Sequence, residues 1–313
     1  MSVEQRRIGQ RGIEARFIRK QIKPLAFKEI PPVADKLIGM WTETHGLGAK
    51  LDFKEGFANA YLEAIKDGYF PVVIANHDSQ SNAVSLIKLS YILTGSANEV
   101  LPQEKRIEGF LLPLAESLDS GRQGKFAKMA YDGAKPTLEK YGIIPVLTTT
   151  KNDENKREMK RKSEQFMKDM KNGVKEGYAI AVLAEGTVES GRRGTDGKRK
   201  GMQEFVDIAL ETPYILAKRY KNQKTIFIPV GIENGTEIHD PTGKLPLPHF
   251  KAFRAGFGFG DAEIGILHIG LPIKSDGPEI GTFIDNYDWA NVNNTVGKAV
   301  ASLIPEEMRG VYK

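Results

Sequence analysis

The sequence of 313 residues contains no cysteine, which excludes disulfide bridges, thiolate metal sites and a cysteine nucleophile. It also lacks any apolar run close to the roughly 20 residues that a membrane-spanning helix needs. The N-terminal arginines are not followed by an apolar stretch, so we expect no secretory signal. These absences favour a globular chain in a reducing compartment.

The composition is that of an ordinary globular protein. Hydrophobic residues make up 40% of the sequence and charged residues 27%, so long disordered stretches are not expected. The net charge is +5, with a pI near 9.0. Such a basic excess suits nucleic acid, an anionic membrane surface or an anionic substrate, and it equally suits a lysine-rich surface that faces water. Charge alone therefore leaves the partner open.

Short apolar runs alternate with helical patterns along most of the chain. Strands are predicted at 70–75, 143–147, 178–184, 225–230 and 264–273, and helices at 83–93, 152–175, 201–220 and 289–303. This alternation predicts an α/β fold with a mixed, largely parallel central sheet flanked by helices. The stretch 240–259, which contains three prolines, is interpreted as a loop and hairpin over the site.

The beginning of the chain has a different pattern. Residues 1–60 are predicted to form an N-terminal helical segment broken by prolines, and residues 61–313 a single domain. Within the segment, Ile13, Phe17 and Ile22 form an apolar stripe with arginines beside it. Such a stripe packs on the body of a protein or lies on a membrane surface, and the sequence leaves both interpretations open.

One of the five histidines, His77, stands where open α/β sheets place their chemistry. It follows the predicted strand 70–75 and precedes the predicted helix 83–93. Imidazole titrates near neutral pH, so His77 is the candidate general base. Its polar neighbours in the sequence are Asn76, Asp78, Ser79 and Asn82. Part of this cluster also has a structural interpretation, because Ser79 is a good N-cap for the helix.

A second polar cluster follows the predicted strand 178–184. It begins with Glu185-Gly186-Thr187 and continues through a glycine-rich loop whose basic residues include Arg193 and Lys200. Glycines let backbone amides approach an anion, and arginine forks suit phosphate oxygens. The loop matches neither the P-loop pattern nor G-x-G-x-x-G. It predicts either a phosphate cradle or a basic hairpin on the surface.

Together the two clusters resemble the glycerol-3-phosphate and 1-acylglycerol-3-phosphate acyltransferase family. The matching pieces, in the family's order, are Asn76-His77-Asp78-Ser79, Ala184-Glu185-Gly186-Thr187, Lys200-Gly201 and Ile228-Pro229-Val230, with Ile269-Gly270-Leu271-Pro272-Ile273 as a further segment. The resemblance extends from Pro71 to Ile273 and does not cover the N-terminal part. The family also has a middle block with an arginine, for which Arg106 and Arg122 are the candidates here.

The resemblance implies an O-acyltransferase that moves a fatty acyl group from acyl-CoA or acyl carrier protein to a hydroxyl of glycerol 3-phosphate or a lysophospholipid. It implies that His77 is the general base and that substrate is bound by Asn76, Ser79, Glu185, Gly186, Thr187, Arg193 and Lys200. We expect no metal, no cofactor beyond the acyl donor and no nucleic-acid partner. The expected place is the cytoplasm, with or without a peripheral contact on the inner face of the membrane.

The sequence departs from the family at one position. The family's first motif places an aspartate five residues after the histidine, and Asn82 stands there instead. An amide oxygen can hold the imidazole tautomer but provides no charge for the imidazolium. In a serine-protease triad the same change lowers turnover by about 10⁴. Three interpretations follow: Asn82 orients His77, a distant carboxylate replaces the aspartate, or the protein is a non-catalytic, lipid-binding relative.

Two other classes of function compete with acyl transfer. His77-Asp78 and His239-Asp240 are His-Asp pairs of the kind found in metal-dependent phosphohydrolases, but one follows a predicted strand and the other lies in a proline-rich loop. Phe253, Phe257 and Phe259 suit stacking on the bases of a nucleic acid, or the core side of a strand. Neither class accounts for as many features of the sequence as acyl transfer does.

Overall fold

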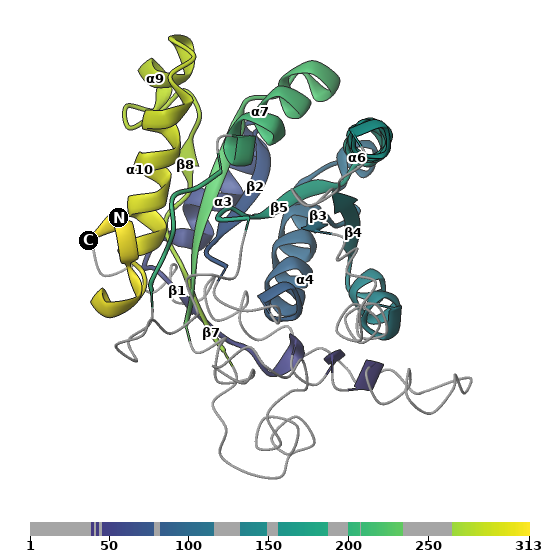
Figure 1. Cartoon of the computed structure of the whole chain (residues 1–313), viewed down its shortest axis with the longest axis horizontal. Helices are drawn as coiled ribbons and strands as arrows, with labels where there is room; N and C mark the ends of the chain where they lie inside the picture. The colour runs from purple at the N-terminus through teal and green to yellow at the C-terminus, as the bar shows by residue number, and fades with distance from the viewer. Residues whose placement is uncertain are drawn as a thin grey trace.

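A mixed eight-stranded sheet forms the centre of the molecule (Figure 1). The computed structural model describes residues 39–40, 42–43, 46–77, 82–115, 132–148, 156–186, 200–206, 208–233 and 265–313. The strand order is β1-β7-β6-β2-β5-β3-β4, and β8 pairs with β6 outside this path. The strands are β1 (Lys50–Phe53), β2 (Phe70–Ala75), β3 (Phe110–Ala115), β4 (Ile143–Thr148), β5 (Ala179–Leu183), β6 (Thr225–Glu233), β7 (Ile266–Ile269) and β8 (Ile273–Lys274).

The central strand is β2, and its neighbours β5 and β6 both run parallel to it. The parallel sheet continues through β3 and β4, whereas β7 and β8 are antiparallel to β6. All six residues of β2 are buried, as expected for a strand with helices on both faces. The predicted α/β fold with a largely parallel central sheet is confirmed.

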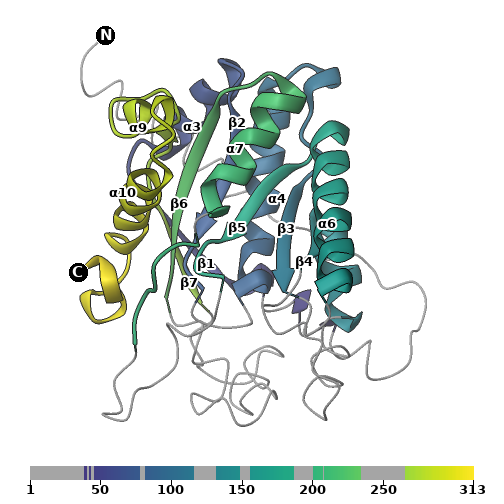
Figure 2. The ribbon, with the colours of Figure 1, turned by 45° about the horizontal axis from the view of Figure 1, so that its top comes forward.

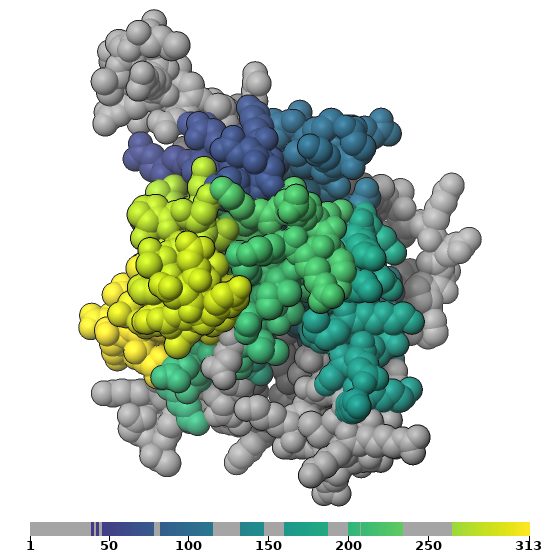
Figure 3. Space-filling view, turned by 90° about the horizontal axis from the view of Figure 1, so that it is seen from above, coloured from purple at the N-terminus to yellow at the C-terminus, as the bar shows by residue number. Residues whose placement is uncertain are grey.

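Helices cover both faces of the sheet. α3 (Phe57–Lys66) and α4 (Asn82–Val100) pack on one face, and α6 (Lys156–Glu176), α7 (Ile208–Lys221) and α10 (Trp289–Ala301) pack on the other. Figure 2 shows α6 and α7 in front of the sheet and α4 behind it. Figure 3 shows α7 between α6 and the C-terminal helices α9 (Gly281–Asp285) and α10. Within the described ranges, no helix has the length and apolar character needed to cross a membrane.

Most of the predicted elements are present. The predicted strands 70–75, 143–147, 178–184 and 225–230 correspond to β2, β4, β5 and β6, and α4, α6 and α10 overlap their predicted helices. On α6, the apolar residues Met170 and Val174 are buried. The predicted strand 264–273 is divided into β7 and β8. The stretch 240–259 and the stripe around Phe17 lie outside the described residues.

The N-terminal segment is not helical throughout, which corrects the prediction for residues 1–60. Lys50–Phe53 form β1, which pairs with β7. Four residues are too few to separate a period of 2 from a period of 3.6, so the pattern carried no strand signal. The sheet therefore extends across the boundary that was predicted at residue 60.

Two further elements differ from the predictions. Residues 201–206 are not helical, and α7 begins only at Ile208. The strand β3, whose apolar run contains Pro113, was not predicted; β2, β4 and β6 also contain a proline, so this residue does not set β3 apart. β3 pairs with β5 only through Phe110 and Leu111, before this proline. The two strands are therefore paired at their beginnings and not at their carboxyl ends.

A histidine on β7 joins three strands. Nδ1 of His268 lies 2.9 Å from Oδ2 of Asp52 on β1, and Nε2 lies 2.9 Å from Oε2 of Glu233 at the end of β6. Burial lowers the pKa of His268, but the hydrogen bonds to Glu233 and Asp52 and the charges of these carboxylates outweigh it, and the net shift of the pKa is upward.

This cluster makes the stability of the fold depend on pH. Because the folded pKa of His268 lies above the unfolded value of about 6.5, the protonated ring stabilises the fold fully below that unfolded value. The contribution is lost as the pH rises through the folded pKa. We expect the difference in unfolding free energy between wild type and His268→Gln to be larger at about pH 6 than at about pH 9. Urea unfolding at both pH values measures it, with Tyr287→Phe as an exposed control, and a difference that grows with pH would contradict the prediction.

Candidate active site

His77 lies just past the carboxyl end of β2, and its ring contacts the first residue of α4. Nδ1 of His77 is 3.2 Å from Oδ1 of Asn82. An amide oxygen can only accept a hydrogen bond, so this contact holds the tautomer whose proton is on Nδ1. The basic lone pair is then on Nε2. Asn82 is fully buried at the start of α4. The orienting contact expected of Asn82 is thus present.

Asn76 connects the end of β2 to β6. Its Nδ2 donates to the carbonyl oxygen of Ile232 over 3.0 Å, and its Oδ1 accepts from the Ile232 amide over 2.6 Å. The side chain therefore extends the β2–β6 ladder beyond its last backbone pair, Ala75 with Val230. The sequence predicted a substrate contact for Asn76. The structure instead gives both of its polar groups a backbone partner, so its contacts position the turn that carries His77.

Glu185 joins the end of β5 to two other segments. One carboxylate oxygen accepts a hydrogen bond of 2.7 Å from the backbone amide of His77, and the other accepts one of 2.8 Å from the amide of Gln203. The side chain is only 2% exposed. A carboxylate that accepts two backbone N–H groups matches the acceptor-only chemistry of an ionised acid. Glu185 was predicted to bind substrate, and its observed contacts hold the backbone at His77.

The remaining predicted site residues are only partly within the described residues. Gly186 is exposed directly after Glu185, and Lys200 is exposed at the start of the segment that leads to α7. Ser79, Thr187 and Arg193 lie outside the described residues. Arg106, one candidate for the arginine of the family's middle block, is exposed in the loop before β3, whereas Arg122 lies outside the described residues.

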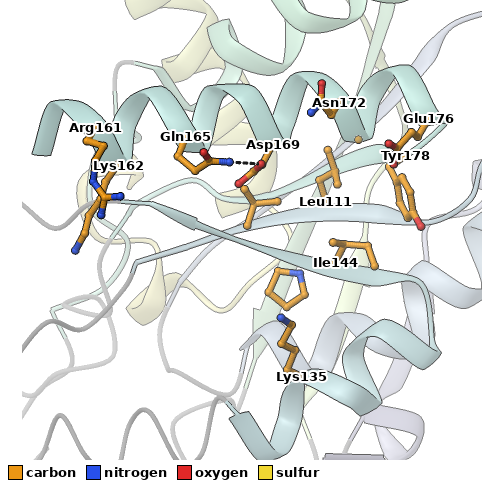
Figure 4. Close-up of a pocket in the computed structure, with 13 residues that line it drawn as sticks. Leu111, Lys135, Ile144, Arg161, Lys162, Gln165, Asp169, Asn172, Glu176 and Tyr178 are labelled. Atoms are coloured by element: carbon orange, nitrogen blue, oxygen red, sulfur yellow. Dashed lines mark hydrogen bonds between the residues drawn. The ribbon is translucent and has the colours of Figure 1, made fainter. Parts of the chain in front are cut away.

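A groove of about 690 Å³ lies at a different place, between α6 and the edge of the sheet (Figure 4). Its floor is apolar and includes Leu111 and Ile144, and Lys162 and Asp169 stand on its α6 side. β4 is separated from β2 by β5 and β3 in the strand order. The groove therefore does not contain His77, and we do not assign it to the candidate active site.

No metal centre is found in the described part of the chain, where no group of three or more histidine, aspartate and glutamate side chains could hold a metal ion. Of the two His-Asp pairs, Asp78, His239 and Asp240 lie outside the described residues. Nδ1 of His77 faces the amide oxygen of Asn82, a contact that suits proton transfer at the ring.

Comparison with known proteins does not name a family. A scan against protein-family models found no family that matches this chain, and a search of curated proteins found no match. The assignment of function therefore depends on the residues and their geometry.

Two residues of the candidate site were not found by sequence reasoning. Gln203 and Ile232 take part through their backbone groups, and any residue except proline offers such groups, so no side-chain pattern marks them. Their partners, Glu185 and Asn76, did carry a signal. Each is a polar residue placed directly after a buried strand, where a buried side chain needs hydrogen-bond partners.

The contacts of Asn76 predict a large loss of stability on its removal. Asn76→Ala leaves the amide and carbonyl of Ile232 without their side-chain partners, and a buried unsatisfied group costs about 1–3 kcal/mol. We expect the unfolding free energy to fall by about 2 kcal/mol or more, measured by urea unfolding.

A matched comparison is available in the same chain. Asn98 makes the same pair of bonds to the backbone of Ile107, but those bonds are only partly buried, so water can replace them. Asn98→Ala should therefore cost less than Asn76→Ala. Equal losses would show that burial does not set the cost.

Proposed function

We propose that this chain is an O-acyltransferase that moves a fatty acyl group from a thioester to a hydroxyl. The observation that carries the proposal is the contact between Nδ1 of His77 and Oδ1 of Asn82 at the carboxyl end of the central strand. This contact leaves the lone pair on Nε2, where a general base needs it. The carboxyl end of a parallel strand is also where open α/β sheets bind their ligands.

The reaction that fits this geometry begins with proton transfer. Nε2 of His77 removes the hydroxyl proton of the acceptor, and the oxygen attacks the carbonyl carbon of the thioester. The tetrahedral intermediate collapses, the carbon–sulfur bond breaks, and the imidazolium returns its proton to the leaving thiolate. The products are an ester and a free thiol. Asn82 keeps the ring in the required tautomer throughout.

The start of α4 supports the same chemistry. α4 begins at Asn82, which touches the imidazole, so the positive end of the helix dipole lies beside the proposed reacting atoms. An oxyanion that forms on the thioester carbonyl is stabilised by such a helix end. The same field favours an anionic acceptor, which agrees with the phosphate implied by the resemblance.

The substrates and the location belong to this proposal as well. The resemblance of Asn76-His77-Asp78-Ser79 and Glu185-Gly186-Thr187 implies glycerol 3-phosphate or a lysophospholipid as acceptor. It implies acyl-CoA or acyl carrier protein as donor, a role in phospholipid biosynthesis, and a place in the cytoplasm or on the inner face of the membrane. Gly186 and Lys200 are the exposed residues of the second cluster that we propose to contact the phosphate.

One observation favours a second candidate, a lipid-binding relative without catalytic activity. Asn82 is neutral, so the contact with His77 adds no charge that would stabilise the imidazolium. The measurement of turnover distinguishes the two candidates.

His77→Ala should abolish the release of free thiol from an acyl-CoA in the presence of glycerol 3-phosphate, because the general base is lost. A thiol-reactive dye measures the rate, and acyl carrier protein and a lysophospholipid are tested as the other donor and acceptor. The matched control is His268→Gln at about pH 8, where the protonated ring contributes less stability; it should retain the activity. Full activity in His77→Ala would contradict the assignment of His77 as the general base.

Asn82→Asp should raise kcat, because a carboxylate at this position stabilises the imidazolium that forms during proton transfer. The gain has an upper bound of about 10⁴, the size of the loss caused by the opposite change in a serine-protease triad. The apparent pKa in the pH dependence of kcat should also rise, since a neighbouring negative charge favours protonated histidine. A slower Asn82→Asp variant would show that the amide group of Asn82 has its own role.

A further inference from the structure

Residues 200–206, here called the strap, connect the second polar cluster to α7 and lie against the end of β5. The Gln203 amide donates to Glu185, and the Val206 amide donates to the carbonyl oxygen of Ala184 over 3.0 Å. Inside the strap, Nε2 of Gln203 donates to the carbonyl oxygen of Gly201 over 2.8 Å. The strap therefore follows a defined path beside the carboxylate that holds His77.

The other side of the strap pairs with the C-terminal turn, residues 306–313, which contains two 3₁₀ helices, Glu306–Met308 and Gly310–Tyr312. The Met202 amide donates to the carbonyl oxygen of Met308 over 2.8 Å, and the Val311 amide donates to the carbonyl oxygen of Met202 over 3.0 Å. The hydroxyl oxygen of Tyr312 accepts a 3.0 Å hydrogen bond from the Phe205 amide. Three hydrogen bonds thus join two segments about a hundred residues apart in the sequence.

Glycines allow this close approach. Gly201 and Gly310 have φ values of 75° and 54°, a left-handed conformation that favours glycine. A Cβ on Gly201 would lie 2.5 Å from the amide nitrogen of Gly310, and one on Gly310 would overlap the carbonyl oxygen of Met202. Both neighbours are backbone atoms, and Met202 is held by its hydrogen bonds to Met308 and Val311, so it cannot move aside alone. Gly297 on α10 likewise leaves room for the Tyr312 ring, which a Cβ would overlap.

The charge of Glu185 also acts on Tyr312 in the C-terminal turn. Burial raises the pKa of the Tyr312 hydroxyl, the bond from the Phe205 amide lowers it, and the charges of Glu185 and Glu204 raise it; the net shift is upward. Tyr312 therefore remains a neutral phenol beside a carboxylate.

We propose that the C-terminal turn is a positioning element of the candidate active site, which holds His77 in place through the strap and Glu185. The connection runs from Met308 and Tyr312 to Met202 and Phe205, then from Gln203 to Glu185, and from Glu185 to the backbone amide of His77. The effect of this connection on catalysis rests on the proposed function, whereas the hydrogen-bonded path from the turn to His77 does not. A small displacement of a catalytic group costs about 10²-fold in rate.

Amide hydrogen exchange at single-residue resolution tests the connection in the full chain. Gly310→Ala forces the turn away from Met202, and Tyr312→Phe removes only the oxygen that binds the Phe205 amide. In both variants we expect faster exchange at Gln203 and His77, with the larger effect in Gly310→Ala, and no change in α6. Val311→Ala is the matched control, because its exposed side chain changes while its backbone bond to Met202 is kept.

Faster exchange confined to residues 306–313 and the strap, with His77 unchanged in both variants, would overturn the inference. Activity is a separate arm. If the wild type releases thiol, Gly310→Ala should lower kcat by about 10²-fold while KM for the acyl donor stays near the wild-type value. If the wild type releases none, the proposed function fails, and exchange at His77 still decides whether the turn positions that residue.

Discussion

The candidate site depends on one buried carboxylate. Glu185 accepts hydrogen bonds from the amides of His77 and Gln203, and it is almost fully screened from water. If either amide moved away, a buried carboxylate would lose a hydrogen bond, which is costly in a low-dielectric interior. The cost keeps the end of β2, the end of β5 and the strap together. The position of the imidazole is therefore set by backbone contacts as much as by Asn82.

Local pattern was enough for some strands and not for others. β2 and β5 are short runs of buried residues that are almost all apolar, and Met170 and Val174 of α6 are buried, so each of these elements can be recognised from a few neighbouring residues. β1 and β3 were not predicted. β1 is too short to show a period. β3 pairs with β5 through Phe110 and Leu111 only, and its other pairing is with β4. Both depend on strands that are distant in the sequence.

The same limit applies to the site. The position of His77 between strand and helix, and its contact with Asn82, follow from residues five apart in the sequence. The partners of Asn76 and Glu185 do not, because Ile232 and Gln203 are brought near only by the completed sheet and strap. A polar residue in a motif can bind substrate or hold the backbone, and the sequence of the motif is the same for both roles. The hydrogen-bond partners in the structure distinguish these roles.

The cluster around His268 has a consequence for the pairing of β6 with β7. β6 ends at Glu233 and β7 begins at Ile266, and His268 joins these two antiparallel strands at the end where the chain passes from one to the other. Because this anchor lies within the paired strands, the register of β6 and β7 is held by side chains of the sheet and not only by the chain that connects the two strands.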